Sequence, residues 1–70
     1  MPTTFPIWLD RDGKPVSCVE KIKVMHENLT ELQQMAQDAF EDAILMGCEP
    51  GQVKQFLIEQ MQALENPYHD

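Results

Sequence analysis

The sequence has few basic residues for its length. Five Lys and Arg stand against twelve Asp and Glu among 70 residues, which gives a formal net charge of −7. Phosphate binding depends on clustered Lys and Arg that release counterions, so this balance argues against a nucleic-acid-binding protein. It argues equally against binding to anionic membranes. The acidity instead favours solubility, or a protein partner with a basic surface.

Long apolar runs are absent as well. No segment reaches the roughly 18 consecutive apolar residues of a membrane-spanning helix. The first residues, MPTTFPIWLD, lack the basic region and the long apolar core of a secretory signal. Two cysteines and five methionines suit a reducing compartment, so we expect a cytoplasmic protein.

Motifs that carry catalysis are also missing. The chain has no Ser-His-Asp order, no glycine-rich phosphate loop and no HExxH motif. Ligand pockets measure about 300 Å³ or more, a size that is hard to enclose within so short a chain. We therefore expect no enzyme activity and no cofactor.

The segment DRDG begins like a calcium-binding loop but does not continue like one. An EF-hand loop needs acidic residues at its positions 1, 3 and 5 and a glycine at position 6. Counted from Asp10, the fifth residue is Lys14 and the sixth is Pro15. Asp bonds readily to its own backbone and Gly accepts positive φ, so the segment predicts a tight turn and no metal site.

Cys18 and Cys48 stand near opposite ends of one predicted helix. The helix between them would span about 45 Å, far beyond the Cα separation of about 7 Å that a disulfide tolerates. No disulfide within one chain is therefore expected, and the sequence has no CxxC motif for zinc. A disulfide between Cys18 of one copy and the Cys48 region of another copy remains an alternative. It would support a different function, a thiol-based redox or metal responder.

Prolines at positions 2, 6 and 15 exclude a helix from residues 1–16. We expect an extended arm with a turn, or a short β-ribbon. A lone hairpin is marginally stable in water, so its apolar residues need a surface to pack on. Trp8 is the candidate anchor, whereas an exposed Trp8 would be a hot spot for a partner. His26 has no second histidine near it and is expected on the surface.

A long helix is predicted over residues 17–46. Ser17 and Glu20 have the spacing of a capping box, which satisfies backbone N–H groups at a helix start. Gly47 suits the left-handed conformation that ends a helix.

A second helix is predicted over residues 50–65, with a tail at 66–70. Pro50 is well placed at the first helical position, and Glu49 lies close to the cap. Two helices joined by a short turn should fold back on one another. The predicted fold class is mainly α, an antiparallel helical hairpin in a single small domain.

Apolar residues recur along the long helix at alternating steps of three and four, the heptad pattern of a coiled coil. This seam consists of Ile22, Met25, Leu29, Leu32, Ala36, Ala39, Ala43 and Met46. The second helix, at about 22 Å, can cover only about half of the first, the half with the alanines. Leaving each large residue of the other half in water would forfeit about 1.5–3 kcal/mol. Either the N-terminal arm or a second copy should cover them, and the unbroken seam favours the second copy.

An antiparallel homodimer would pair large with small residues along this seam, as interdigitating layers require. The facing pairs are Leu32 with Ala36, Leu29 with Ala39, Met25 with Ala43, and Ile22 with Met46. The same pairing brings Lys21 and Lys23 towards an acidic stretch of the partner, which includes Asp42 and Glu49. We therefore predict a homodimeric protein–protein interaction or regulatory module. An acidic decoy for a basic nucleic-acid-binding surface is a weaker alternative.

Overall fold

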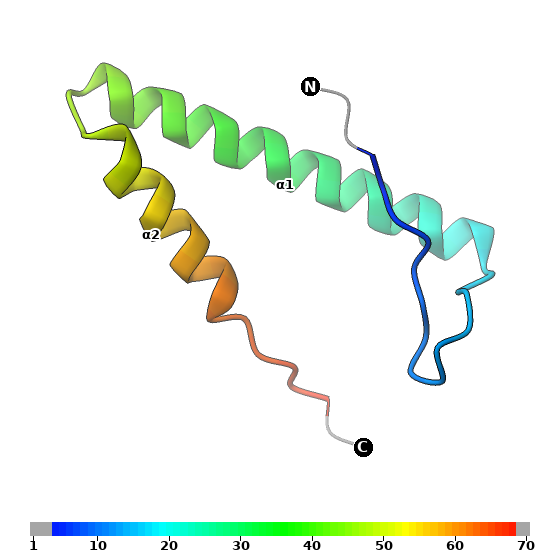
Figure 1. The fold of residues 1–70 in the computed structure, drawn as a ribbon. Helices are drawn as coiled ribbons and strands as arrows, with labels where there is room; N and C mark the ends of the chain where they lie inside the picture. Colours follow the sequence, from blue (N-terminus) through cyan, green and yellow to red (C-terminus); the bar gives the residue numbers. More distant parts are fainter. Residues whose placement is uncertain (1–3, 69–70) are drawn as a thin grey trace. The chain divides into compact units, whose positions relative to one another are not determined.

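The chain is mainly helical (Figure 1). The computed structural model describes residues 4–68, so positions 1–3 of the predicted arm and 69–70 of the predicted tail lie outside the described residues. Helix α1 spans Val19–Leu45 (27 residues), and helix α2 spans Pro50–Gln62 (13 residues). Within the described range the only strand-like pairing is a single isolated bridge. The prediction of a mainly α fold with two helices that pack together is confirmed.

The chain divides into two compact units, Met1–Gln34 and Met35–Asp70. The first unit joins the N-terminal segment to the first part of α1. The second unit joins the last part of α1 to α2. Each unit therefore contains one stretch of α1 and one other segment that can cover it.

Helix α1 begins later than the residue 17 that the sequence predicts. Its first backbone hydrogen bond runs from the Ile22 N–H to the Cys18 carbonyl, at 3.0 Å, so Cys18 holds the N-cap position. The reason lies in the preceding segment, where the Val16 N–H donates to the Trp8 carbonyl at 2.8 Å and keeps the chain extended. The predicted capping box is wrong in register, and Glu20 lies inside the first turn.

Helix α1 ends in a Schellman motif. The Cys48 N–H donates to the Ala43 carbonyl at 3.0 Å, and the Gly47 N–H donates to the Ile44 carbonyl at 2.9 Å. Gly47 has φ +95°, a left-handed conformation that glycine adopts without strain. The predicted stop at Gly47 is confirmed. Met46, the last residue predicted in the helix, lies one residue beyond it.

Glu49 caps α2 with its side chain. Its carboxylate accepts hydrogen bonds from the N–H groups of Gly51 (2.9 Å) and Gln52 (2.6 Å). Pro50 follows at the first helical position, where no N–H is needed. The bonds from Gly51 and Gln52 lower the pKa of Glu49, because they stabilise the ionised carboxylate. The predicted roles of Glu49 and Pro50 are confirmed.

Helix α2 ends at Gln62, before the residue 65 that the sequence predicts. The Leu64 N–H donates to the Met61 carbonyl at 3.3 Å, so the last turn tightens and the α-helical ladder stops. Beyond it, the Asn66 Oδ1 accepts from the Tyr68 N–H at 2.8 Å across the intervening proline. This local turn competes with helix continuation, and it explains the earlier end.

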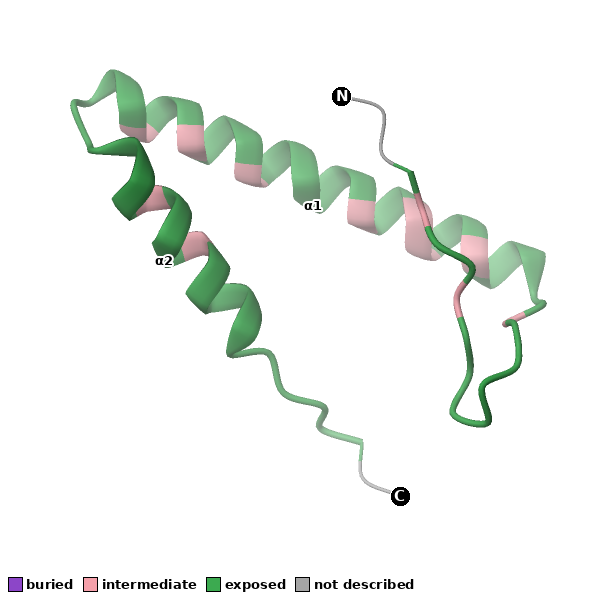
Figure 2. Ribbon diagram, in the orientation of Figure 1, coloured by how far each residue is buried: buried purple, intermediate pink, exposed green. Residues whose placement is uncertain are grey.

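No residue in the range 4–68 is buried (Figure 2). The best-covered residues of the second unit are half-buried, and they come from both helices: Ala36, Phe40, Ala43, Val53 and Leu57. The Lys54 ammonium lies 6.0 Å from the centre of the Phe40 ring and closes one edge of this contact. Helix α2 thus covers the alanine-rich half of α1, as its length predicts.

Candidate functional site

The N-terminal segment forms a hairpin that positions Trp8. The Asp10 N–H donates to the Lys14 carbonyl at 2.7 Å, and Leu9 and Pro15 form an antiparallel bridge. In the turn, Oδ1 of Asp10 accepts from the N–H groups of Asp12 (2.9 Å) and Lys14 (3.0 Å). The predicted turn is confirmed, and the Asp10 carboxylate holds it together.

The positive φ of the turn falls on Gly13, at +81°. No atom lies within 4 Å of the position that a Cβ would take there, so the conformation alone favours glycine. The hairpin is therefore specified by its own residues, independently of α1.

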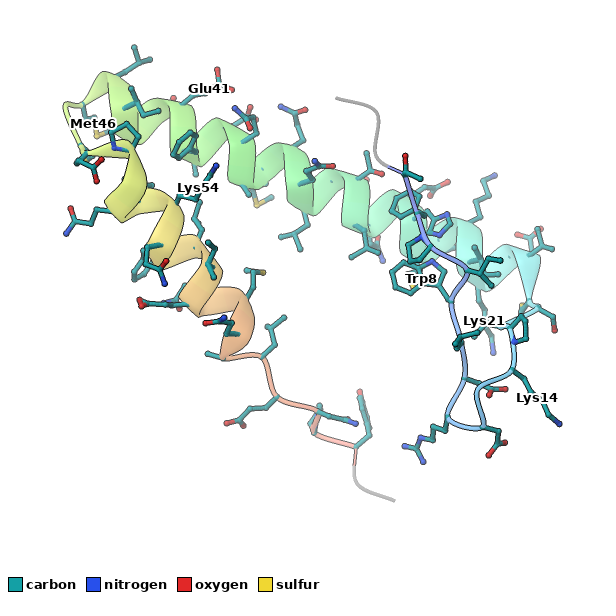
Figure 3. All side chains as sticks on the ribbon, in the orientation of Figure 1. Trp8, Lys14, Lys21, Glu41, Met46 and Lys54 are labelled. Carbon is teal, nitrogen blue, oxygen red and sulfur yellow. The ribbon has the colours of Figure 1, made fainter. Side chains whose placement is uncertain are left out.

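His26 joins this hairpin to α1. The Trp8 indole Nε1–H donates to Nε2 of His26 at 2.7 Å. The Phe5 ring stacks on the imidazole, with ring centroids 3.8 Å apart and planes 6° apart. Figure 3 shows Trp8 lying against the first part of α1. The expectation that His26 is a surface residue is wrong: its ring is half-buried beneath two aromatic residues.

This cluster escaped sequence reasoning because its members share no periodic pattern. Trp8 and His26 are 18 residues apart, and they lie on segments of different conformation. The available signal was chemical: an aromatic pair on an extended segment needs a surface, and a half-polar ring such as imidazole can both stack and accept a hydrogen bond. Trp8 itself is half-buried, in the place of an anchor.

The predicted seam residues differ in how well they are covered. Five are half-buried, namely Ile22, Met25, Leu29, Ala36 and Ala43, whereas Ala39 is exposed. Leu32 has 46% of its surface exposed and Met46 has 82%. The first unit therefore covers part of its share of the seam with the hairpin and leaves the rest in solvent.

Helix α1 carries a shallow groove in the first unit. This groove of about 460 Å³ is lined by apolar Val24, Met25 and Leu29 and by polar Glu20, Lys21 and Asn28. Val24 is 54% exposed although it stands mid-helix. We call this groove, together with the neighbouring Leu32, the α1 face. Val24 and Leu32 are thus apolar side chains of α1 that the chain itself leaves largely in solvent.

Both cysteines are free and exposed. Among residues 4–68, no three His, Cys, Asp or Glu side chains gather in a way that could hold a metal ion. Neither helix in the described range has the length and apolarity to cross a membrane. Comparison with known proteins returns no matching family model, no matching curated protein and no matching solved structure. A functional proposal therefore stands on the chain's own geometry.

Proposed function

We propose that this chain is a small non-enzymatic interaction module that acts as an antiparallel homodimer, with the α1 face as its contact surface. The observation that carries the proposal is that no residue in the range 4–68 is buried. A folded domain is stabilised mainly by apolar area removed from water. A chain that removes so little by itself gains most from a partner.

A second copy suits the α1 face because large residues meet small ones. In the antiparallel register, the groove residue Leu29 of one copy faces Ala39 of the other, whereas Ala43, the position opposite Met25, is already half-buried against α2. Ala39 is exposed and offers only a methyl group, so the partner backbone can approach closely. Full burial of each large side chain contributes about 1.5–3 kcal/mol.

Charge complementarity supports the same occupant. Lys21, which lines the groove, stands in the basic part of the sequence, and the helix between Val24 and Leu45 contains acidic residues but no Lys or Arg. The antiparallel register brings Lys21 towards Asp42 of the partner. Glu49 contributes its charge to the same region while its oxygens cap α2. A parallel pair would instead place the basic ends together and the acidic ends together.

The two exposed cysteines allow a direct test of this orientation. A short bismaleimide should give a dimer on a denaturing gel, and peptide mapping should find Cys18 joined to Cys48 of the other copy. Cys18→Ser and Cys48→Ser should each abolish the dimer band. Links between like cysteines would indicate a parallel pair, and a monomeric mass by light scattering at micromolar concentration would remove the homodimer.

A matched pair of variants tests the contact surface. Ala39→Glu adds a charge opposite Leu29 of the partner, and it should weaken dimerisation about 100-fold, the scale of an unpaired charge in an apolar interface. Gln37→Glu adds the same charge to α1 away from the seam. It also removes the hydrogen bond from Gln37 Nε2 to Glu41, so circular dichroism should measure its effect on the helix, and dimerisation should change little. Equal effects of the two variants would show that net charge, and not the seam, controls association. A monomer would leave a protein with a basic surface as the alternative partner.

The exposed thiols favour a second candidate function, a thiol-based redox response. In the antiparallel register, Cys18 approaches Cys48 of the partner. A peroxide could oxidise the two thiols to a disulfide, and it would itself be reduced to water or an alcohol. Peroxide treatment should then give a reducible covalent dimer that neither single serine variant forms. An unchanged oligomeric state of the Cys18→Ser, Cys48→Ser double variant under oxidation, with the wild type equally unchanged, would end this candidate.

A further inference from the structure

The contact between the hairpin and α1 includes a titratable ring. His26 accepts a hydrogen bond from the Trp8 indole Nε1–H at 2.7 Å. The hairpin's own bonds, such as that from the Val16 N–H to the Trp8 carbonyl, do not involve His26. Docking of the hairpin and formation of the hairpin therefore depend on different groups.

The direction of this hydrogen bond fixes the protonation state of the ring. An indole N–H is a donor only, so Nε2 of His26 must carry a lone pair to accept it. A proton on Nε2 would set two N–H donors against each other at the same short distance. Histidine is the side chain that changes charge between about pH 5 and 8. We propose that His26 is a pH-sensitive latch, which holds the hairpin on α1 while Nε2 is unprotonated and releases it when Nε2 takes a proton.

The Phe5 ring opposes the release to some extent. It stacks on the imidazole at 3.8 Å and would also attract an imidazolium through its π face. This attraction is weak where the ring pair is open to solvent, and it does not replace the lost acceptor. Phe5 therefore weakens the coupling between protonation and release without reversing its direction.

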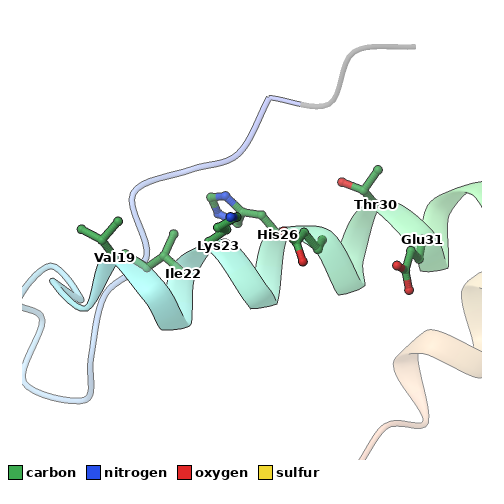
Figure 4. Close-up of a pocket in the computed structure, with 7 residues that line it drawn as sticks. Val19, Ile22, Lys23, His26, Thr30 and Glu31 are labelled. Carbon is green, nitrogen blue, oxygen red and sulfur yellow. The ribbon is translucent and has the colours of Figure 1, made fainter.

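Charged residues of α1 border the same ring. Lys23, Glu27 and Glu31 line, together with His26, an open hollow of about 600 Å³ (Figure 4). On the hairpin side, the recorded contacts of His26 are the uncharged rings of Phe5 and Trp8.

Release would change the surface of the first unit. The half-buried residues of this part of α1 are Ile22, Met25, His26 and Leu29. In Figure 2, the half-buried segments of α1 include the place where the N-terminal segment crosses the helix. Undocking would expose more of these residues to solvent while the turn at Asp10 stays formed. The inference does not depend on the homodimer, because every group in it belongs to one copy.

The chain contains a single tryptophan, so its indole N–H gives one resonance in a ¹⁵N–¹H spectrum of the full chain. On lowering the pH from about 8 to about 5, we expect this resonance to move to the position of a free indole and to lose its protection from exchange. The amides of Asp12 and Lys14, which donate to Asp10 within the turn, should respond less than the indole. An unchanged indole resonance would overturn the latch.

Two glutamine variants separate His26 from the other histidine. His26→Gln keeps an acceptor oxygen but cannot titrate. Whatever the chemical shift of the Trp8 indole is at about pH 8 in this variant, it should not change with pH. His69→Gln should respond as the wild type does. A response of the same size in the His26→Gln protein would contradict the proposal, as would its loss in the His69→Gln protein.

Discussion

The two units hold their segments against α1 by different chemistry. In the first unit, an irregular hairpin contacts the helix through two aromatic rings and one imidazole, and a side-chain hydrogen bond of 2.7 Å joins Trp8 to His26. In the second unit, a regular helix follows α1 through a Schellman turn and a carboxylate cap, and it packs aliphatic groups against alanines and Phe40. One attachment depends on protonation, whereas the other depends on backbone geometry and apolar area.

The two attachments differ in the sequence separation of the residues that form their hydrogen bonds. The bonds that join α1 to α2 link residues at most five positions apart, so little chain entropy opposes them. The Trp8–His26 bond closes a span of 18 residues. Segments held by few contacts open most readily. The hairpin should therefore detach from α1 under conditions that leave the second unit intact, and each prediction below addresses this contrast.

The largest expected effect is that of Phe40→Ala. Phe40 is the largest half-buried side chain of the second unit, and its truncation should lower the free energy of unfolding by about 1.5 kcal/mol, roughly half the value of a fully buried side chain. Urea unfolding followed by circular dichroism at 222 nm measures the loss. Trp8 fluorescence in the absence of urea should not change, because the reporter belongs to the first unit.

Phe56→Ala is the matched control for this prediction. Phe56 is 58% exposed on the same unit, so its removal should cost less than about 0.5 kcal/mol. If Phe40→Ala moved the fluorescence and dichroism transitions by the same amount, the two units would unfold as one, and the contrast between them would fail.

Sequence reasoning succeeded where a signal is local. Gly47 and Pro50 mark the turn between the helices, and Asp10 and Gly13 mark the hairpin turn, because each residue type satisfies a need of its own backbone. Helix ends were less accurate: α1 starts after the hairpin releases the chain at Val16, and that constraint comes from a residue eight positions earlier. The existence of both helices followed from periodicity alone.

The site was predictable only in part. The seam positions follow from the heptad pattern, but their unequal exposure depends on where the hairpin and α2 lie. Nothing in the spacing of Phe5 and Trp8 indicates that His26 is their partner, since aromatic stacking has no sequence period. Met46 shows the limit of the seam argument, because the Schellman motif leaves it beyond the helix and 82% exposed.

A smaller effect, in both units, is expected from alanine at the two glycines of positive φ. Gly13→Ala and Gly47→Ala should each cost about 1 kcal/mol, because a Cβ disfavours this backbone conformation. In neither case does any atom lie within 4 Å of the new Cβ, so the cost is conformational in both. The pair therefore applies the same perturbation to each unit.

The readouts should separate the two variants. Gly13→Ala should alter the Trp8 indole resonance and leave the helical dichroism nearly unchanged. Gly47→Ala should reduce the dichroism and leave the indole resonance in place. If both variants changed the indole resonance and the dichroism alike, the stabilities of the two turns would be coupled through α1. The two units would then not unfold independently.

The smallest effect concerns the cap of α2 and its dependence on pH. The N–H groups of Gly51 and Gln52 lower the pKa of Glu49 below its ordinary value of 4.5, so the folded state prefers the ionised carboxylate. The contribution to stability is therefore fully present above pH 4.5 and is lost as the pH falls through the lowered value.

Glu49→Gln should reduce the helical dichroism at about pH 7, and the wild type and the variant should give the same dichroism as the pH approaches about 2. Glu59→Gln, in the last turn of α2, controls for the loss of charge and should show no such convergence. A difference between wild type and Glu49→Gln that is the same at both pH values would show that the cap does not depend on ionisation, and the second unit would then contain no titratable contact comparable with that of His26 in the first.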